Sequence, residues 1–313
     1  MSTSELLTLV VSESPAASPG DDLQAFWQAS ESLRTRFTAP VERAVAGGFF
    51  GDRLACAFAS GYEAALHALV PALPADSVAS FCVTEEGGNH PRAVQTTIET
   101  VSSGRIVVRG KKRWSTLAPL ADTLVTVAKS GIGDDGRPKL WAVVIPKSAR
   151  GLTATTMPPT PFVPEVPHAE LVFDRVELRA DAILAGDGYA NFVKPFRTVE
   201  DLHVQAAMLG YLLSVAARWG FSDTHRERLA ALILSAVSIA ALDPSGPETH
   251  VALAGLLTEI ADLHSAIESE WAHVDDAERE RWYRDRALVQ VASKARQKRR
   301  ERAWERISGR DQP

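Results

Sequence analysis

The first clear pattern in the chain is an apolar stripe of helical spacing between Gly51 and Leu73. Apolar residues recur there at steps of three and four, which predicts an amphipathic helix. The stripe consists of Leu54, Phe58, Tyr62, Ala65 and Leu69. Pro71 and Pro74 follow it, and because proline cannot continue a helix, they predict its end and a boundary near Ser77.

The pattern changes from Ser80 to about Leu184, where short β-branched runs alternate with turn residues. The expected strands are residues 81–83, 105–108, 124–127, 140–145 and 170–173. Ser103-Gly104 and residues 131–136 have the composition of hairpin turns. No helix-length pattern separates the runs, so we expect antiparallel pairing in a barrel or sandwich rather than a parallel sheet.

Helical spacing returns beyond Gly188 and indicates a bundle. One apolar stripe comprises Val204, Met208, Tyr211, Val215 and Trp219, and a second comprises Leu253, Leu256, Ile260, Leu263, Ile267 and Trp271. A further helix is expected from Asp275 to about Arg306, with Asp275 or Asp276 as its N-cap.

These segments predict an α+β protein of N-terminal helices, a central antiparallel β-barrel domain and a C-terminal helical bundle. Its expected parts are a disordered leader at residues 1–20, a helical region at 21–76, a β domain at 77–186 and the bundle at 187–313.

Composition and charge exclude several classes of protein. The 313 residues contain 34 Lys and Arg against 39 Asp and Glu, a net charge of −5, so we expect no nucleic-acid partner. The most apolar segment, 230–242, is too short to cross a membrane, and the N-terminus lacks the pattern of a signal peptide. Cys56 and Cys82 form no disulfide framework or metal-ligand spacing, which predicts a cytoplasmic protein without membrane association.

The stretch from Phe81 to Pro91, F-C-V-T-E-E-G-G-N-H-P, carries the strongest candidate chemistry, together with Trp114-Ser115-Thr116 one hairpin later. A strand that ends in a hydroxyl and a glycine-rich loop lets backbone N–H groups approach a flat polar ligand. A nearby tryptophan can cover the face of that ligand, which suits an isoalloxazine ring. The alternative is an ordinary strand and turn, with Trp114 buried in the core.

Three motifs resemble segments of the acyl-CoA dehydrogenases. Phe81 to Glu85, F-C-V-T-E, resembles their Y-C-V-T-E-P segment, and Trp114-Ser115-Thr116 resembles their W-I-T segment. Residues 172–176, V-F-D-R-V, resemble the closing strand of their β domain, and the spacing of all three agrees. The order of helices, β domain and bundle is also that of the family. The resemblance covers most of 51–217 and, more weakly, 253–303.

The resemblance implies an FAD-dependent α,β-dehydrogenation of an acyl-CoA or related thioester, with electrons passed to an electron-transfer flavoprotein or another acceptor. It places Phe81, Val83 and Thr84 at one edge of the flavin, Trp114, Ser115 and Thr116 on its other side, and Asn89 and His90 near the pyrophosphate or thioester. Glu86, Asn89 and His90 replace the family's proline, glycine and serine, which changes the phosphate contacts expected of this loop.

Removing an α proton requires a carboxylate in a dry site. By resemblance, Glu200 stands where some family members carry their catalytic glutamate on the first bundle helix, and it is the candidate base. The late Y-x-G-T loop that supplies the base in other members is not found. The alternative is that Glu200 is a solvated residue of a first helical turn. Asp201 replaces a family arginine and is expected to repel a CoA phosphate.

Two family segments, R-x-x-F-G and Q-x-x-G-G-x-G, are not found, and the sequence ends at Pro313, sooner than is usual in the family. In the family these elements hold the adenine half of the cofactor, often from a partner subunit. We therefore keep a second hypothesis, a degenerate non-catalytic subunit that acts as a structural or ligand-binding partner. Under both hypotheses we expect a homo- or hetero-oligomer.

Two weaker patterns concern metals and anions. Glu200-x-x-His203 and Glu270-x-x-His273 match the pairs of di-iron bundles, but residues 229–242 offer no interior carboxylate, so no metal is expected. The basic tail from Lys294 to Arg306 predicts a solvated or interface helix. Contact with an acidic partner or a CoA phosphate is the alternative.

Overall fold

The computed structural model describes residues 3–13, 22–88, 90–102 and 104–309. The chain divides into two compact units. The helical unit comprises Met1–Ala68, Pro161–Val163 and Thr198–Pro313, and the β unit comprises Leu69–Thr160 and Pro164–Arg197. The β unit therefore extends beyond the expected 77–186 at both ends. A short piece of the segment between its strands, Pro161–Val163, is grouped with the helices instead.

In the N-terminal part of the helical unit, the described residues form α1 (Thr3–Ser12), α2 (Leu23–Ala29), α3 (Glu31–Arg36), α4 (Pro40–Phe50) and α5 (Leu54–Leu69). Helix α5 confirms the first apolar stripe. The predicted disordered leader is wrong over α1. Leu6, Leu9 and Val10 lie at helical spacing and are each 1% exposed, so the short apolar stretch is long enough to pack as one helical face.

The C-terminal part of the helical unit confirms both bundle stripes. It contains α6 (Lys194–Trp219), α7 (Asp223–Ala240), α8 (Pro247–Ala266), α9 (Asp276–Asp285) and α10 (Ser293–Ile307). Two 3-10 helices join them, at Glu268–His273 and Arg286–Gln290, so the last expected helix is divided in two. Asp275 is the N-cap of α9, and its side chain accepts bonds from two backbone N–H groups.

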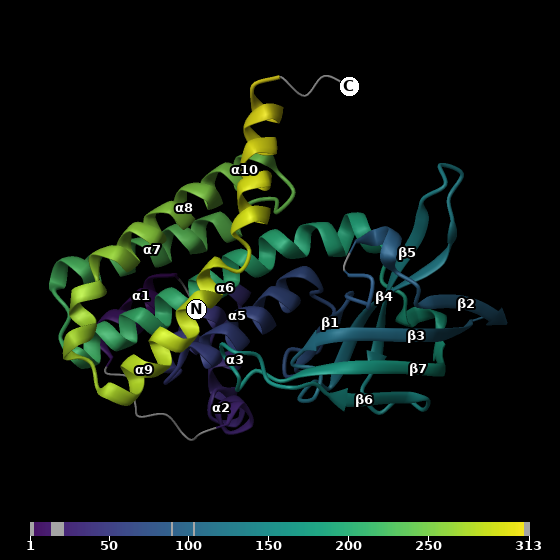
Figure 1. Ribbon diagram of the computed structural model, residues 1–313, viewed down its shortest axis with the longest axis horizontal. Helices are drawn as coiled ribbons and strands as arrows, with labels where there is room; N and C mark the ends of the chain where they lie inside the picture. The colour runs from purple at the N-terminus through teal and green to yellow at the C-terminus, as the bar shows by residue number, and fades with distance from the viewer. Residues whose placement is uncertain (1–2, 14–21, 89, 103, 310–313) are drawn as a thin grey trace. The chain divides into compact units, whose positions relative to one another are not determined.

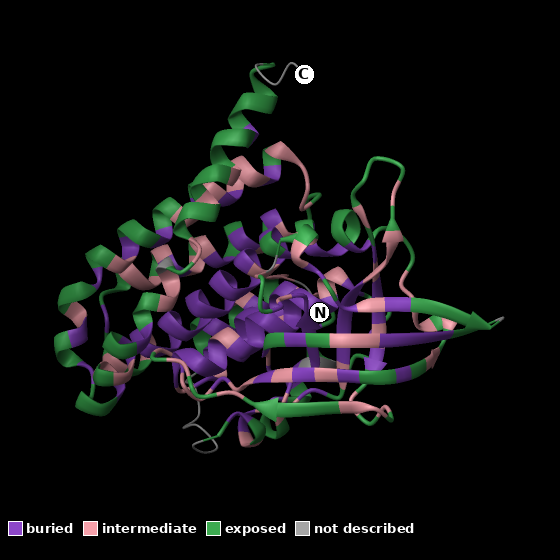
Figure 2. Cartoon of the chain, turned by 45° about the vertical axis from the view of Figure 1, so that its right-hand side comes forward, coloured by how far each residue is buried: buried purple, intermediate pink, exposed green. Residues whose placement is uncertain are grey.

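Close backbone approach fixes α4 and α5 against α6. A Cβ atom added to Gly48 would lie 1.8 Å from the backbone oxygen of Ala207. One added to Gly61 would lie 2.5 Å from the Cα of Val204. Glycine is therefore required at both crossings, and Figure 2 shows the densely buried helices that result. No helix in the described ranges combines the length and apolar character needed to cross a membrane.

The β unit is built on one seven-stranded sheet. Its strands are β1 (Ala79–Cys82), β2 (Thr97–Ser102), β3 (Arg105–Thr116), β4 (Thr123–Ile132), β5 (Pro138–Pro146), β6 (Leu152–Thr156) and β7 (His168–Arg179). The order is β1-β4-β2-β3-β7-β6, with β5 on the other edge of β4 (Figure 1). Residues 188–193 form a π-helical turn before α6.

The sheet is mixed, which corrects the predicted antiparallel barrel. The two expected hairpins, β2–β3 and β4–β5, are antiparallel as predicted. Strand β1, however, pairs in parallel with β4, and β2 also meets β4 in parallel at Thr97 and Lys129. The intervening β2–β3 hairpin serves as the crossover that parallel strands require. Apolar residues of alternating strand positions form the core of this unit, among them Ile106, Val108, Leu124, Val143 and Phe173.

Candidate functional site

The two motifs that suggested a ligand site lie side by side in the β unit. The N–H of Arg113 donates to the carbonyl oxygen of Thr84 at 2.8 Å, so the segment after β1 runs next to β3. On the same two strands, the Ser80 hydroxyl donates to the carbonyl oxygen of Thr116 at 2.7 Å. Thr84 and Trp114-Ser115-Thr116 are therefore neighbours in space, as the sequence predicted from their motifs.

Trp114 is presented to solvent by an irregular point in β3. The register against β7 shifts between Lys112 and Ser115, and Trp114 has a positive φ of 55° in a region that few non-glycine residues occupy. Its side chain is 45% exposed and meets the His168 ring edge-to-face, with ring centroids 5.8 Å apart. The alternative that Trp114 fills the core is wrong, since the bulge turns the indole outward.

The remaining motif residues differ in how far they reach the surface. Thr84 and Thr116 are half-buried. Phe81 on β1 and Val83 just after it are both buried, and Phe81 packs edge-to-face on Phe196, with ring centroids 4.6 Å apart. Ser115 is 1% exposed and its Oγ has no hydrogen-bond partner, so its hydroxyl lies inside the sheet while the neighbouring indole is outside.

The loop after Thr84 is a tight turn. Glu85 and Gly88 exchange backbone hydrogen bonds of 3.0 and 2.9 Å, and Gly88 has a φ of 100° with open space around it. Asn89 lies outside the described residues. His90 is exposed, and its Nδ1 accepts the N–H of Arg92 at 3.2 Å, which caps a short 3-10 turn at Pro91–Ala93.

Beneath this loop lies a buried ion pair that was not predicted from the sequence. Lys112 Nζ lies 2.7 Å from Glu85 Oε1 and 3.2 Å from the carbonyl oxygen of Val83. The Glu85 carboxylate also accepts the N–H groups of Gln95 and Thr96, at 2.7 and 3.1 Å. Together these contacts fix the start of the loop to β3.

Opposing effects set the charge of this pair. Burial would raise the pKa of Glu85, but the Lys112 ammonium and the two amide N–H groups outweigh it and hold that pKa below its usual value. Burial lowers the pKa of Lys112, and Glu85 opposes the change. The strand pattern gave a signal for this pair, since Ile106, Val108 and Lys112 share the inward-facing parity of β3 and all are buried.

Glu200, the candidate base, is half-buried on α6 in the helical unit. One turn later His203 is buried, with its Nδ1 2.7 Å from the carbonyl oxygen of Val199. Burial lowers the pKa of His203 to about 4, so its ring is neutral at pH 7. The part of the chain that the structure describes contains no group of three or more His, Cys, Asp or Glu residues placed to hold a metal.

Asp201 does not present the free negative charge that the sequence predicted. It is 8% exposed and accepts bonds from Arg296, whose Nε lies 2.9 Å from Oδ1, and from Arg299. Two guanidinium groups of the basic tail therefore face one carboxylate. The expected repulsion of a phosphate by Asp201 is wrong because its charge is more than compensated by α10.

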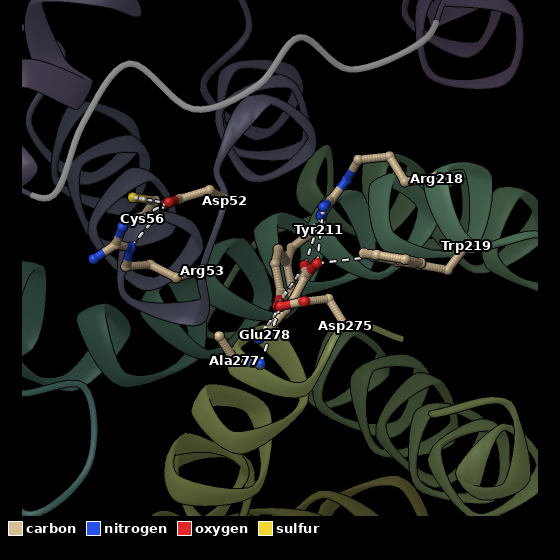
Figure 3. Close-up of polar contacts among 9 residues, drawn as sticks. All are labelled: Asp52, Arg53, Cys56, Tyr211, Arg218, Trp219, Asp275, Ala277 and Glu278. Carbon is tan, nitrogen blue, oxygen red and sulfur yellow. Dashed lines mark hydrogen bonds and ion pairs between the residues drawn. The ribbon is translucent and has the colours of Figure 1, made fainter. Parts of the chain in front are cut away.

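A second buried network ties α9 to α6 (Figure 3). Glu278 is 3% exposed and accepts Nη1 and Nη2 of Arg218 at 2.8 and 2.6 Å. It also accepts Nε1 of Trp219 at 2.9 Å and the Tyr211 hydroxyl at 3.4 Å. Its partners lie about sixty positions earlier in the chain, where no local pattern indicates them.

The similarity to known proteins is clearest in the middle of the chain. Residues 80–176 match the family model described as the middle domain of acyl-CoA dehydrogenases, which includes β1 to most of β7 and both motifs. A probable acyl-CoA dehydrogenase of Bacillus subtilis (strain 168), YngJ, is 29% identical over 151 residues. A benzylmalonyl-CoA dehydrogenase of Aromatoleum aromaticum is 31% identical over 105 residues.

These matches are partial in both proteins. They cover 48% and 33% of this chain, and 39% and 26% of the Bacillus and Aromatoleum relatives. The chain thus matches well under half the length of these relatives.

The fold likeness extends further than the sequence match. The apo-form of PigA has a TM-score of 0.65 over 98% of both chains at 14% identity, and an FAD complex of PigA has a TM-score of 0.63 over 96% of this chain and 92% of that one, also at 14% identity. The middle-domain match and the two relatives show that residues 80–176 are similar to the middle domain of acyl-CoA dehydrogenases, and the likeness to PigA shows that the chain shares its fold.

Proposed function

We propose that the chain is an FAD-dependent oxidoreductase of the acyl-CoA dehydrogenase type that holds the isoalloxazine ring on its β unit. The observation that carries the proposal is Trp114, a 45% exposed indole held outward by a left-handed residue inside a strand. Strained backbone of this kind gathers at ligand sites, where it positions a side chain at a cost in stability. The FAD complex of the structurally similar PigA supports the same cofactor.

The residues present fit a flat, polar ring. Trp114 supplies an aromatic face, and the hydroxyls of Thr84 and Thr116 lie on adjoining segments, where they can meet polar ring edges. Gly88 leaves open space at the start of the loop that would carry Asn89 and His90 toward a phosphate. We assign packing roles to Phe81 and Val83. Any contact from Ser115 is assigned to its backbone, because its hydroxyl is buried.

FAD, when bound, would supply the hydride acceptor. We assign to Glu200 the removal of the Cα proton of an acyl-CoA or related thioester, a role that requires a carboxylate partly withdrawn from water. The half-burial of Glu200 on α6 agrees with this assignment. An electron-transfer flavoprotein or another acceptor would then reoxidise the enzyme. Leu234 and Leu242 expose apolar surface, at 37% and 46%, which supports a homo- or hetero-oligomer that the mass in solution would test.

Cofactor binding gives the direct test. FAD added to the purified protein should remain bound after gel filtration, with the absorbance of a protein-held flavin. Trp114→Ala should weaken the affinity for FAD by about tenfold, equivalent to about 1.4 kcal/mol. Trp304→Ala is the matched control, because Trp304 is 51% exposed and belongs to the helical unit. Equal FAD affinity in the wild type and Trp114→Ala would remove the ring from this site.

Catalysis is tested separately from binding. If a series of acyl-CoA thioesters includes a substrate, it should reduce the bound flavin, and Glu200→Gln should slow that reduction by ~10² to 10⁴ with FAD affinity unchanged. Glu259→Gln, an exposed glutamate of α8, should leave the rate unchanged. Reduction at the wild-type rate in Glu200→Gln would contradict its role as the base. If FAD binds but no thioester reduces it, the non-catalytic subunit replaces the enzyme hypothesis.

A further inference from the structure

Strand β6 is an open edge of the sheet in the β unit. It follows β7 at the end of the strand order and lies at the rim of the sheet in Figure 1. At the other end, β1 is wholly buried, and the outer edge of β5 is covered where the N–H of Leu184 donates to the carbonyl oxygen of Ala142 at 2.9 Å. Residues 153–156 of β6 are all exposed. Among the described strands, this edge is therefore left free to accept another strand.

The hydrogen bonds to β7 show which residues of β6 point outward. The carbonyl oxygen of Gly151, just before the strand, accepts the N–H of Asp174 at 2.8 Å. The register of the two strands from there to the end of β6 has no shift. Because backbone groups alternate in direction along an antiparallel strand, the odd-numbered residues bond to β7 and the even-numbered ones point away from it. The outward-pointing residues are Leu152, Ala154 and Thr156.

Most of these outward groups have no hydrogen-bond partner within the described ranges. The N–H of Leu152 donates to the carbonyl oxygen of Ala149 at 3.2 Å, whereas both backbone groups of Ala154 and of Thr156 make no bond there. Natural proteins usually protect such an edge with lysine, proline or a bulge. Residues 152–156, L-T-A-T-T, contain no charge and no proline, and they pair with β7 without a bulge. The edge thus lacks the features that prevent strand pairing.

We propose that β6 pairs in antiparallel orientation with β6 of a second copy of this chain, about a two-fold axis at Ala154. The outward-pointing residues are symmetric about Ala154, as a two-fold interface requires. Each Ala154 N–H would donate to the carbonyl oxygen of the other, and each Thr156 N–H to the carbonyl oxygen of the partner's Leu152. No charged side chain lies on the strand, so no like charges meet at the axis. This interface is separate from the flavin site and from the apolar helical surface that supports an oligomer.

The side chains of β6 agree with this occupant. Ala154 pairs with Leu171 of β7, which is 0% exposed, so the alanine methyl group lies on the core face of the sheet although Ala154 itself is exposed. A second β6 would continue the sheet and cover this position. On the other face, Thr153 would lie opposite the partner's Thr155, and threonine pairs stabilise neighbouring strands. Two prolines follow at residues 158–159, and because they have no N–H to donate, they limit the pairing to this segment.

The register is tested by Ala154→Cys in the full chain under mild oxidation. Residues of a hydrogen-bonded pair have Cα atoms about 5.5 Å apart, within reach of a disulfide, so this variant should form a dimer that a reducing agent dissociates. Thr155→Cys is the matched control. Its two copies would lie diagonally, about 7–8 Å apart, and should form far less dimer. Cys56 and Cys82 are buried, so the wild type should form none.

Association is tested separately by sedimentation over a series of concentrations. Pairing of one short strand is a small interface, so the wild-type assembly should dissociate on dilution. Ala154→Lys places two ammonium groups at the axis and should lower the mass of the assembled species by about half. Ile132→Lys is the matched control, because Ile132 is 59% exposed on β4 of the same sheet, and it should leave the mass unchanged.

Four results would overturn the proposal: a strictly monomeric wild type, no disulfide dimer of Ala154→Cys, equal cross-linking of Thr155→Cys, or a wild-type mass in Ala154→Lys. If a strand of another protein occupies this edge instead, purified Ala154→Cys will stay unlinked. Should Ala154→Lys fail to fold, the comparison of the two cysteine variants still decides the question.

Discussion

Each unit buries a glutamate, and the two carboxylates are neutralised in different ways. In the β unit, Glu85 is paired with the ammonium group of Lys112 at 2.7 Å. In the helical unit, Glu278 accepts two nitrogens of Arg218 at 2.8 and 2.6 Å and the indole N–H of Trp219 at 2.9 Å. One pair is a compact point contact within a sheet, and the other is a forked contact between helices.

The cations of these pairs differ in their access to water. The side chain of Lys112 is 0% exposed, whereas that of Arg218 is 29% exposed. If its glutamate is lost, Lys112 keeps a charge inside the sheet that water cannot reach without opening the strands. Arg218 can instead be hydrated from the surface. The free-energy cost of breaking a buried ion pair therefore depends on whether water can reach the charge that remains.

The largest effect is therefore expected for Glu85→Gln. It should lower the free energy of unfolding by about 3–5 kcal/mol, because it leaves the Lys112 ammonium buried and unpaired. Denaturant unfolding measures this loss. Glu86→Gln, the exposed neighbour, should change stability by less than about 0.5 kcal/mol. Adding Lys112→Met to Glu85→Gln should restore much of the loss, and a double variant no more stable than the single one would contradict the explanation.

The next effect concerns acid. The pKa of buried His203 is about 4 in the folded protein and 6.5 in its ordinary state, so between these values the unfolded chain binds a proton that the native protein does not. The part of the stability that depends on His203 should fall by ~3 kcal/mol as pH falls from 6.5 to 4. His203→Gln should flatten that dependence, and exposed His90→Gln should not. Parallel pH curves for the wild type and His203→Gln would exclude this origin.

The same reasoning separates Glu85 from His203 by pH. The depressed pKa of Glu85 gives stability that is fully present above its ordinary value of 4.5 and is lost only as pH falls through the lower folded value. Hydrogen exchange near pH 5.5 should therefore show α6 around His203 weakened while the strands around Glu85 keep their protection. Equal weakening of both regions would show that the window is not set by these two groups.

Periodic patterns were sufficient to predict the more buried strands and the bundle helices, because each of these elements buries one face. Strands β2 and β6 were not among the expected strands, because most of their residues are exposed. Ile106 and Val108 alternate along β3, and Leu253, Leu256 and Ile260 repeat on α8. The pairing of β1 with β4 could not be predicted in this way, since alternation shows which side of a strand is buried but not which strand lies beside it. The hairpin turns fixed only the local pairs, so the sheet was expected to be wholly antiparallel.

The candidate site shows the same limit. The motifs located Thr84 and Trp114, and the structure places their segments together. The bulge that turns Trp114 outward has no pattern of its own. Lys112 had the parity of a buried residue, but its partner Glu85 stands 27 positions away. Asp201 meets Arg296 across 95 positions, so its charge looked free in the sequence. The charge state of these residues depends on partners far away in the sequence, so it could not be predicted from the neighbouring residues.

The smallest effect, and the sharpest test of the comparison, is expected for Glu278→Gln. It should lower the free energy of unfolding by about 1–3 kcal/mol, less than Glu85→Gln, because the glutamine oxygen still accepts one donor and Arg218 can turn toward water. Denaturant unfolding of both variants under one condition measures the difference. Glu280→Gln, exposed on the same helix α9, controls for the loss of a charge near the helix start and should cost less than about 0.5 kcal/mol. If Glu278→Gln costs as much as Glu85→Gln, the exposure of the remaining cation does not decide the cost of breaking these pairs.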